Sequence, residues 1–266
     1  MALNETYILF FEKHWDYPSC NKYVKEHWAD GFIYSAVYLM VIFGGQFYMQ
    51  ERKRFDLRPA LALWSGILAI FSIVGSFRVL PEMIHSVRDH SLEYSVCSGS
   101  YFEDPVAGFW AFIFVLSKII ELGDTVFIVL RKQELIFLHW YHHITVLLYV
   151  WYSYPEKIAS GRWYMAMNFI VHSLMYTYYT LRALKFNIPK QVNILITSLQ
   201  LLQMAVGIAI NIFTYGVLNS GRKCDQTYFN VKICFMMYFS YFLLFIHFFY
   251  TTYIVKKPKT FHNKQQ

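Results

Sequence analysis

The sequence predicts an all-α, polytopic membrane protein with seven transmembrane helices. Of its 266 residues, 56% are hydrophobic and only 15% are charged, whereas soluble domains typically carry about 25% charged residues. The apolar residues also come in blocks of about 20, the length of a helix that crosses a bilayer. Short connections leave no room for a separate soluble domain, so we expect residues 1–266 to form one membrane domain. The expected spans cover residues 31–50, 60–80, 108–130, 134–153, 163–183, 191–215 and 233–255.

The distribution of Lys and Arg predicts a lumenal N-terminus and a cytosolic C-terminus. In this orientation the cytosolic segments 51–59, 131–133, 182–190 and 256–266 hold 13 of the 24 basic residues. The lumenal segments hold nine over a much greater length, so the asymmetry follows the positive-inside rule. The net charge of +7 therefore needs no nucleic-acid partner to explain it. The N-terminal stretch MALNETYILFFEKHW lacks the pattern of a cleaved signal peptide.

The expected lumenal loops carry two features of secretory-pathway chemistry. Asn4 begins the sequon NET, so we expect it to be a glycosylation acceptor. Cys97 and Cys224 both fall in lumenal loops, where an oxidising compartment permits a disulfide. A bridge between them is the favoured interpretation, and free thiols are the alternative.

The third span carries charged side chains on one helical face. Lys118, Glu121, Asp124 and Thr125 lie at offsets 0, 3, 6 and 7, within about 120° of arc in a helix. A charge at mid-membrane costs about 3 kcal/mol. We therefore expect these residues to face the bundle interior and to pair with one another or with histidines. A purely structural ion-pair cluster is the alternative.

The fourth span contains the histidine-rich segment HWYHH. His139, His142 and His143 lie at offsets 0, 3 and 4 on one face of an apolar helix. They follow the basic residues of the preceding turn closely, which places them in the cytosolic half of the membrane. Metal ligands, catalytic bases, nucleophiles and polar contacts between helices all remain open at this point.

The fifth and sixth spans add further polar faces. In the fifth span one stripe contains Asn168, His172, Met175 and Tyr179, with Tyr176 at its edge. The sixth offers Asn193, Thr197, Gln200 and Gln203; amides of this kind also commonly join helices in membranes. Polar faces at similar depth on four helices predict one interior chamber, open to the cytosol, with apolar walls suited to a hydrocarbon chain.

Four segments resemble the signature motifs of the ELO-type very-long-chain fatty acid elongases, the 3-ketoacyl-CoA synthases of the endoplasmic reticulum. The patterns KxxExxDT, HxxHH, NxxxHxxMYxYY and TxxQxxQ are complete and in family order. They are KIIELGDT (118–125), HWYHH (139–143), NFIVHSLMYTYY (168–179) and TSLQLLQ (197–203). The similarity spans nearly the whole chain, and the stretches around the histidines look like the subgroup that acts on long-chain saturated and monounsaturated acyl-CoAs.

The resemblance implies the condensation of acyl-CoA with malonyl-CoA, without a cofactor or a metal, in seven helices that enclose an acyl tunnel. The family favours an acyl-imidazole route, and the residue carried over as the nucleophile is His142. No cysteine lies near the polar cluster to hold the acyl group, so histidine must act as nucleophile or base. The expected supporting catalytic residues are His172, His139, His143, Lys118, Glu121, Asp124, Asn168, Gln200 and Gln203. Glu121 and Asp124 are expected to fix imidazole tautomers.

Basic residues at the cytosolic ends of the spans are candidates for the phosphates of CoA. The expected substrate-binding residues are Arg131, Lys132, Lys190, Met175, Tyr176, Tyr179 and Thr197, with Arg182, Lys185, Lys256 and Lys257 in the same basic cluster. Implied partners are membrane lipid, a ketoreductase, a dehydratase, an enoyl reductase and a second copy of the chain. The competing hypotheses are a di-iron membrane desaturase or hydroxylase and a seven-span receptor or transporter.

Overall fold

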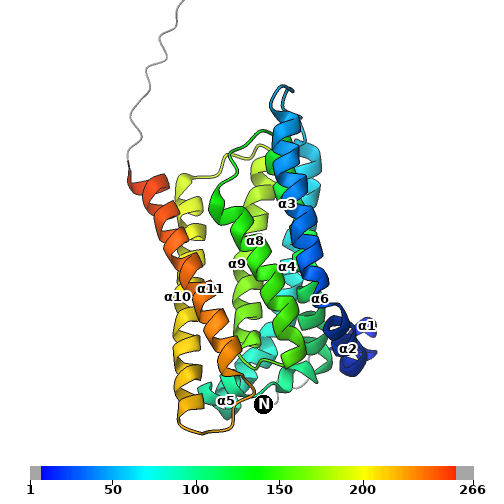
Figure 1. Cartoon of the computed structure of the whole chain (residues 1–266), viewed down its shortest axis with the longest axis vertical. Coiled ribbons are helices and arrows are strands. Elements are labelled where there is room, and N and C mark those ends of the chain that lie inside the picture. The colour runs from blue at the N-terminus through cyan, green and yellow to red at the C-terminus, as the bar shows by residue number, and fades with distance from the viewer. Residues whose placement is uncertain (1–6, 256–266) are drawn as a thin grey trace, which may run out of the picture.

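The computed structural model describes residues 7–255, which form helices joined by short connections with no β-strand among them (Figure 1). The predicted all-α class is therefore confirmed. The helices are α1 (Phe10–Lys13), α2 (Tyr17–His27), α3 (Asp30–Met49), α4 (Arg58–His85), α5 (Leu92–Cys97), α6 (Pro105–Glu121), α7 (Gly123–Leu130), α8 (Phe137–Ser153), α9 (Gly161–Ala183), α10 (Lys190–Asn219) and α11 (Tyr228–Phe249). Single 3₁₀ or π turns lie at Ser86–His90, Ser100–Phe102, Tyr154–Glu156 and Tyr250–Ile254.

Four helical segments are long and apolar enough to cross a membrane, which supports a membrane protein. They are α3, α10, α4 with the turn that continues it, and α11 with the turn that continues it. The expected span 108–130 is not one continuous helix, since α6 ends at Glu121 and α7 begins at Gly123. The Trp64 ring lies so close to Gly123 that a Cβ atom there would come within 2.6 Å of it. The glycine therefore lets Trp64 of α4 pack directly against the polar part of this segment.

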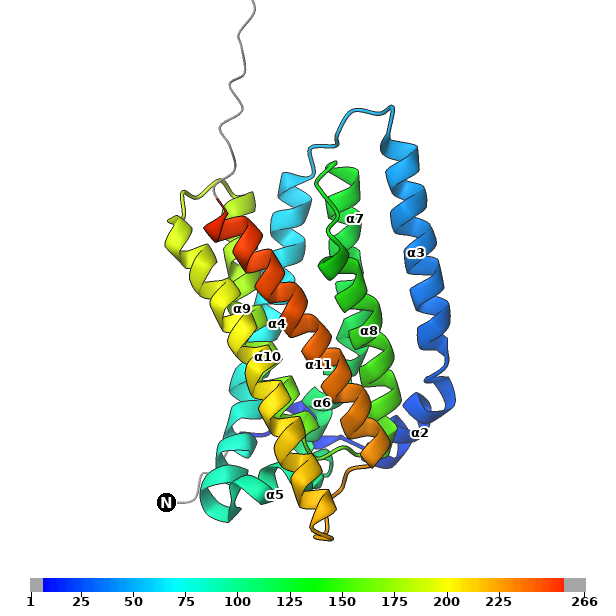
Figure 2. The same ribbon diagram turned by 60° about the vertical axis from the view of Figure 1, so that its left-hand side comes forward.

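The helices surround a common interior (Figure 2). α9, α10, α11 and α8 follow one another around it, with α6 and α7 completing the ring, α4 packed along α9 and α3 against α7 and α8. The contact between α4 and α9 is the most extensive, because small residues such as Ser65, Ala69, Ser72 and Gly75 are buried on α4. Small side chains let membrane helices approach closely.

A disulfide closes one end of the bundle. It joins Cys97, at the end of α5, to Cys224, between α10 and α11, the pair expected from the sequence. The neighbouring Asp225 donates its N–H to the Cys97 carbonyl at 2.8 Å and accepts from the Gly99 N–H at 2.9 Å. We call this end the disulfide end. Asn4, the predicted glycosylation acceptor, and Lys256 and Lys257 lie outside the described residues.

The opposite end carries exposed or half-buried basic side chains, and we call it the basic end. Arg58 begins α4, Arg131 follows α7, and Arg182 and Lys185 lie at the end of α9. The two ends therefore differ in chemistry, with a disulfide at one and clustered positive charge at the other.

Candidate functional site

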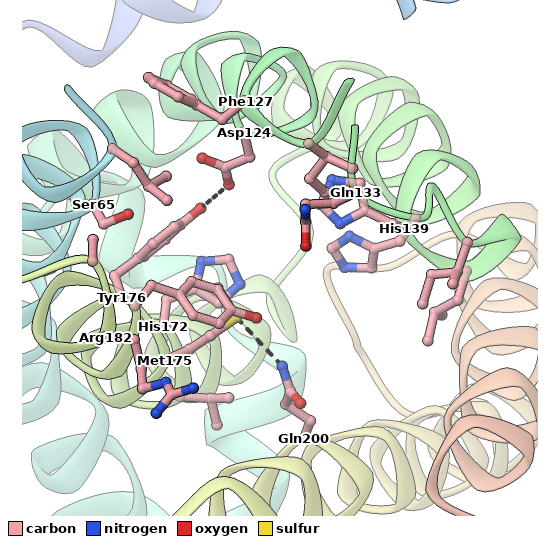
Figure 3. A pocket seen from close by; sticks show the side chains of 18 of the residues that line it. Ser65, Asp124, Phe127, Gln133, His139, His172, Met175, Tyr176, Arg182 and Gln200 are labelled. Carbon is pink, nitrogen blue, oxygen red and sulfur yellow. Dashed lines mark hydrogen bonds between the residues drawn. The ribbon is translucent and has the colours of Figure 1, made fainter. Parts of the chain in front are cut away.

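A cavity of about 870 Å³ lies between α4, α7, α8, α9, α10 and α11 (Figure 3). Its volume lies within the range of sites for small molecules and cofactors, roughly 300–1,000 Å³. Arg58, Arg131, Arg182 and Lys185 line its outer part at the basic end. We call this cavity the chamber. Many residues expected from the sequence line it: Asp124, Arg131, His139, His142, His143, Asn168, His172, Met175, Tyr176, Tyr179, Gln200 and Gln203.

The three histidines of α8 lie together on the chamber wall. The ring centroids of His139 and His143 are 4.5 Å apart, and those of His142 and His143 are 5.6 Å apart. This clustering is the direct result of their i, i+3, i+4 spacing on a helix. All three rings line the chamber, where a bound molecule could reach them.

His139 is held by a chain of hydrogen bonds that begins on α3. Its Nε2 atom lies 2.9 Å from the Thr125 Oγ1 atom, and that hydroxyl lies 2.8 Å from the Tyr38 hydroxyl. Tyr38 and Thr125 are both buried. The chain fixes the orientation of the His139 ring, and Tyr38 belongs to none of the four sequence motifs.

A second polar cluster joins α6 to α9 behind the chamber wall. The Lys118 ammonium donates to Glu121 Oε1 at 2.7 Å and to Asn168 Oδ1 at 3.0 Å. The Asn168 amide then donates through Nδ2 to His172 Nε2 at 3.1 Å. Because Nε2 accepts this bond, the neutral ring carries its proton on Nδ1, which faces Glu121 Oε2 at 3.8 Å. The predicted pairing of Lys118 with Glu121 is present, whereas Glu121 Oε2 faces the His172 imidazole without a hydrogen bond to it.

Asp124 has different partners from those expected. It accepts from the Trp64 indole N–H and from the Tyr176 hydroxyl, each at 2.7 Å (Figure 3). Within residues 7–255 it makes no hydrogen bond to a histidine. Asp124 lies six residues after Lys118, which places it about 120° around the helix from the lysine, and its carboxylate meets side chains of α4 and α9. Asp124 therefore positions Tyr176, and its expected role in fixing an imidazole tautomer is not the one that this geometry supports.

His142 and His143 differ from the other two chamber histidines in their hydrogen bonding. Within the described part of the chain neither ring has a hydrogen-bond partner; His143 is 7% exposed, whereas His142 is half-buried and packs 4.9 Å from the Tyr241 ring. His139 and His172, in contrast, each have a ring nitrogen bound to a protein side chain. A chamber-lining imidazole with free nitrogens can attack an electrophile or accept a proton.

Three predicted substrate-binding residues do not line the chamber. Lys132 donates to the carbonyl oxygens of Gln50 and Arg52, each at 3.0 Å. Thr197 bonds the Asn193 carbonyl and the Tyr253 hydroxyl, and the Lys190 ammonium lies 5.9 Å from the centroid of the Tyr253 ring. The sequence reasoning also missed Arg58, whose proximity to the chamber depends on how α4 packs.

The fold and the chamber together define a class: helical membrane proteins with an internal, histidine-lined chamber and a basic entrance. The comparisons with known proteins are consistent with that class and narrow it. Residues 23–261 match the ELO, GNS1/SUR4 family. The chain is 51% identical over 254 residues to very long chain fatty acid elongase 6 of Drosophila melanogaster, an alignment that covers 94% of this chain and 80% of that protein. It is 47% identical to putative fatty acid elongase 3 of Caenorhabditis elegans, over 96% of this chain and 81% of that protein. It is 45% identical to very long chain fatty acid elongase 6 of Homo sapiens, over 94% of each chain. The chain belongs to the ELO family.

Proposed function

We propose that this chain is the condensing enzyme of fatty acid elongation. It joins a long-chain acyl-CoA to malonyl-CoA and releases carbon dioxide, CoA and a 3-ketoacyl-CoA that is two carbons longer. Family membership and the names of relatives that are 45% to 51% identical support this function. The structural observation that carries the proposed mechanism is a pair of chamber imidazoles without hydrogen-bond partners among the described residues, His142 and His143, behind a basic entrance. His142 is the more exposed of the two, and the family resemblance assigns the nucleophile to it.

The proposed reaction has two steps and needs no cofactor. In the first, a His142 nitrogen forms a bond to the acyl carbonyl carbon, the carbon–sulfur bond breaks, and CoA leaves with the imidazole proton. In the second, malonyl-CoA loses carbon dioxide, and the electron pair of the broken bond forms a thioester enolate. The enolate carbon attacks the acyl carbon, the carbon–nitrogen bond breaks, and the leaving imidazole nitrogen takes up a proton from water, which restores neutral His142.

Neighbouring side chains can support both steps. The amides of Gln200 and Gln203 line the chamber and supply N–H donors for the enolate oxygen. Within residues 7–255 the side-chain hydrogen bond of Gln200 goes to the weak acceptor Met175 Sδ, at 3.4 Å (Figure 3). The amide of Asn168 is already occupied by Lys118 and His172, so this residue orients His172.

The basic end provides the binding chemistry that CoA phosphates require. Arg58, Arg131 and Arg182 line the entrance from three different helical segments, and guanidinium groups bind phosphate in bidentate geometry. Phosphates held at the entrance would place the thioester deeper, near the histidines. Lys132, Lys190 and Thr197 fall outside this proposed site.

We infer a seven-span arrangement in the endoplasmic reticulum membrane with the basic end in the cytosol. Four of the seven spans are the long apolar helices α3, α4, α10 and α11. The other three would be α6 together with α7, then α8, and then α9. Clustered Arg and Lys at one end and a disulfide at the other support this orientation.

A ketoreductase, a dehydratase and an enoyl reductase remain proposed partners, because the keto group of the product must be removed before another cycle. Homodimer formation also stays a prediction.

Reconstitution in liposomes tests the function directly. Purified protein supplied with palmitoyl-CoA and malonyl-CoA labelled at C2 should form a labelled 3-ketoacyl-CoA. The absence of malonyl-dependent product with every acyl-CoA tried would contradict the proposed function. A di-iron oxidase would instead need iron and dioxygen, and in residues 7–255 no group of three or more His, Cys, Asp or Glu is arranged to hold a metal ion.

Mass spectrometry tests the acyl-imidazole step. Protein incubated with palmitoyl-CoA alone should gain one palmitoyl group on the peptide that contains His142. The His142→Ala variant should gain none. An adduct on His172 would overturn the assignment of the nucleophile, and no adduct under conditions that support turnover would indicate direct transfer between the thioesters.

Removing the Tyr38 hydroxyl should slow condensation without disturbing substrate binding. The Tyr38→Phe substitution deletes one hydrogen bond of the chain that orients His139, a loss of about 1 kcal/mol. We expect kcat to fall about three- to tenfold, with an unchanged KM for malonyl-CoA. Steady-state kinetics in liposomes measure both.

The matched control is Tyr34→Phe, one helical turn earlier on α3. The Tyr34 ring packs against Trp151, and its hydroxyl makes no hydrogen bond within the described residues. This variant should retain wild-type kcat. Equal effects of the two substitutions would mean that the hydrogen-bond chain has no part in turnover.

A further inference from the structure

A second cavity lies at the disulfide end of the bundle, opposite the basic entrance of the chamber. It is an open groove of about 720 Å³ beside α2, the helix that contacts α6 and the turn Tyr154–Glu156 at this end (Figure 1). Its lining comes from α2 and the residues just before it, together with Glu103 and Lys157 from two loops. We call this cavity the end groove. Within residues 7–255 it shares no lining residue with the chamber.

Two buried polar atoms at the end groove have no hydrogen-bond partner within the described residues. They are the hydroxyl oxygen of Tyr17 and the Oδ1 atom of Asn21, and both residues line the groove. Tyr17 is only 7% exposed, and its ring packs against those of Phe102 and Tyr154, with centroids 5.5 and 6.3 Å away. Because buried polar groups in folded proteins nearly always have a partner, these two atoms indicate that the groove holds another molecule.

The two atoms define what that molecule must offer. Burial raises the pKa of Tyr17, so its hydroxyl keeps its proton and can donate to an acceptor. The Asn21 oxygen accepts, and it therefore needs an N–H or O–H donor. The two residues are four apart, about 6 Å along the axis of α2, and they face the same side of the helix. A small molecule with an acceptor and a donor a few bonds apart can meet both atoms.

The charges around the end groove carry both signs. Lys157 places its ammonium 4.2 Å from the centroid of the Tyr17 ring and 3.3 Å from a carboxylate oxygen of Glu103. The lining also includes Lys22, Lys25 and Asp16. The side chains of the Lys157–Glu103 pair are 41% and 76% exposed, and exposed ion pairs contribute little, so each partner can bind charge on a ligand. A zwitterion matches this lining better than an anion or a cation does.

The end groove lies at the level of the lipid headgroups. Helix α2 ends at His27, and α3, which is long and apolar enough to cross a membrane, begins at Asp30. Tyr23 and Trp28 of this stretch are 44% and 41% exposed, and such side chains gather at the interface between membrane and water. Phospholipid is abundant at this level, and its phosphate supplies the acceptor that the groove needs.

We propose that the end groove binds the headgroup of phosphatidylethanolamine from the leaflet at the disulfide end. The phosphate accepts a hydrogen bond from the Tyr17 hydroxyl and lies beside the Lys157 ammonium. The ethanolamine ammonium, two carbons further on, donates to Asn21 Oδ1 and faces the Glu103 carboxylate. Phosphatidylcholine has the same phosphate, but its trimethylammonium group has no N–H to donate. The proposal does not rest on the condensation function, because the groove is separate from the chamber.

Native mass spectrometry with competing lipids tests the proposal. Purified protein in detergent is mixed with equal amounts of phosphatidylethanolamine and phosphatidylcholine that carry identical acyl chains. The wild-type protein should retain phosphatidylethanolamine with a preference of roughly tenfold, the factor that one charge-assisted hydrogen bond can supply. Asn21→Ala should lose the preference between the two lipids, whereas Tyr17→Phe should lower the retention of both lipids about three- to tenfold.

The matched control is Tyr23→Phe, which removes a tyrosine hydroxyl of the same helix. The Tyr23 ring stacks on His27 outside the groove lining, so this variant should retain wild-type binding. Tyr17→Phe keeps its ring and removes a hydroxyl without a described partner, so its Tm in detergent that lacks lipid should not fall. Equal retention of the two lipids by the wild-type protein would overturn the proposal and leave water as the occupant of the groove. Displacement of the bound lipid by an equal concentration of soluble glycerophosphoethanolamine would overturn the assignment to a membrane lipid.

Discussion

The His142→Ala variant is expected to lose condensation activity by at least about 10³-fold, the scale of effect for removing a nucleophile or essential base. His142 combines a position at the bottom of the chamber with ring nitrogens that no described protein group occupies. Alanine removes the imidazole that holds the acyl group in the proposed first step. The measurement is the single-turnover rate of 3-ketoacyl-CoA formation in liposomes.

The neighbouring histidines provide the comparison. His139 is hydrogen-bonded to Thr125, and His172 is hydrogen-bonded to Asn168. Their proposed role is therefore to orient the reacting groups and to polarise the thioesters. We expect His139→Ala to cost less than His142→Ala, roughly 10- to 100-fold, as expected for a supporting group. His142→Gln, which keeps a polar side chain of similar size, should be as inactive as His142→Ala. Activity of His142→Ala within tenfold of wild type would exclude His142 as the acyl carrier.

Much of this site could be predicted from the sequence because helical periodicity places motif residues on common faces. The offsets of Lys118 and Glu121 in one span, and of Asn168 and His172 in another, predicted two polar faces. The cost of burying a charge then required that these faces meet. The structure joins all four side chains through a continuous set of contacts.

Other partners could not be predicted, for identifiable physical reasons. Helical offsets placed Asp124 at the edge of the polar face, about 120° from Lys118, and they could not show that Trp64 and Tyr176 from two other helices would bind its carboxylate. Trp64 and Tyr38 resemble ordinary apolar-span residues, and their hydrogen bonds depend on which helices cross. Lys132 has a left-handed backbone conformation with φ of 51°, and its ammonium bonds to carbonyls at the end of α3. Charge and position in the sequence therefore could not distinguish Lys132, which does not line the chamber, from Arg131, which does.

The Lys118→Met variant is expected to show the largest loss of stability. Lys118 and Glu121 are 2% and 3% exposed, and the ammonium contacts Glu121 Oε1, Asn168 Oδ1 and the face of the Phe114 ring. Its removal leaves a buried carboxylate with Ser117 Oγ as its remaining hydrogen-bond donor, at 3.1 Å. Breaking one side of a buried ion pair costs about 3–5 kcal/mol. For a protein of this size we expect Tm in detergent to fall by roughly 10 °C.

The double variant Lys118→Met/Glu121→Gln separates the ion pair from the packing of the lysine stem. It removes both charges together, and buried ion pairs replaced in full by neutral groups are often close to neutral in stability. We therefore expect Tm of the double variant to recover most of the loss seen in Lys118→Met. Lys232→Met, at an exposed position of α11, should stay within about 2 °C of wild type. A double variant no more stable than Lys118→Met would mean that the charge on Glu121 is not the source of the loss. The packing of the lysine stem and its bond to Asn168 would then account for the stability of this cluster.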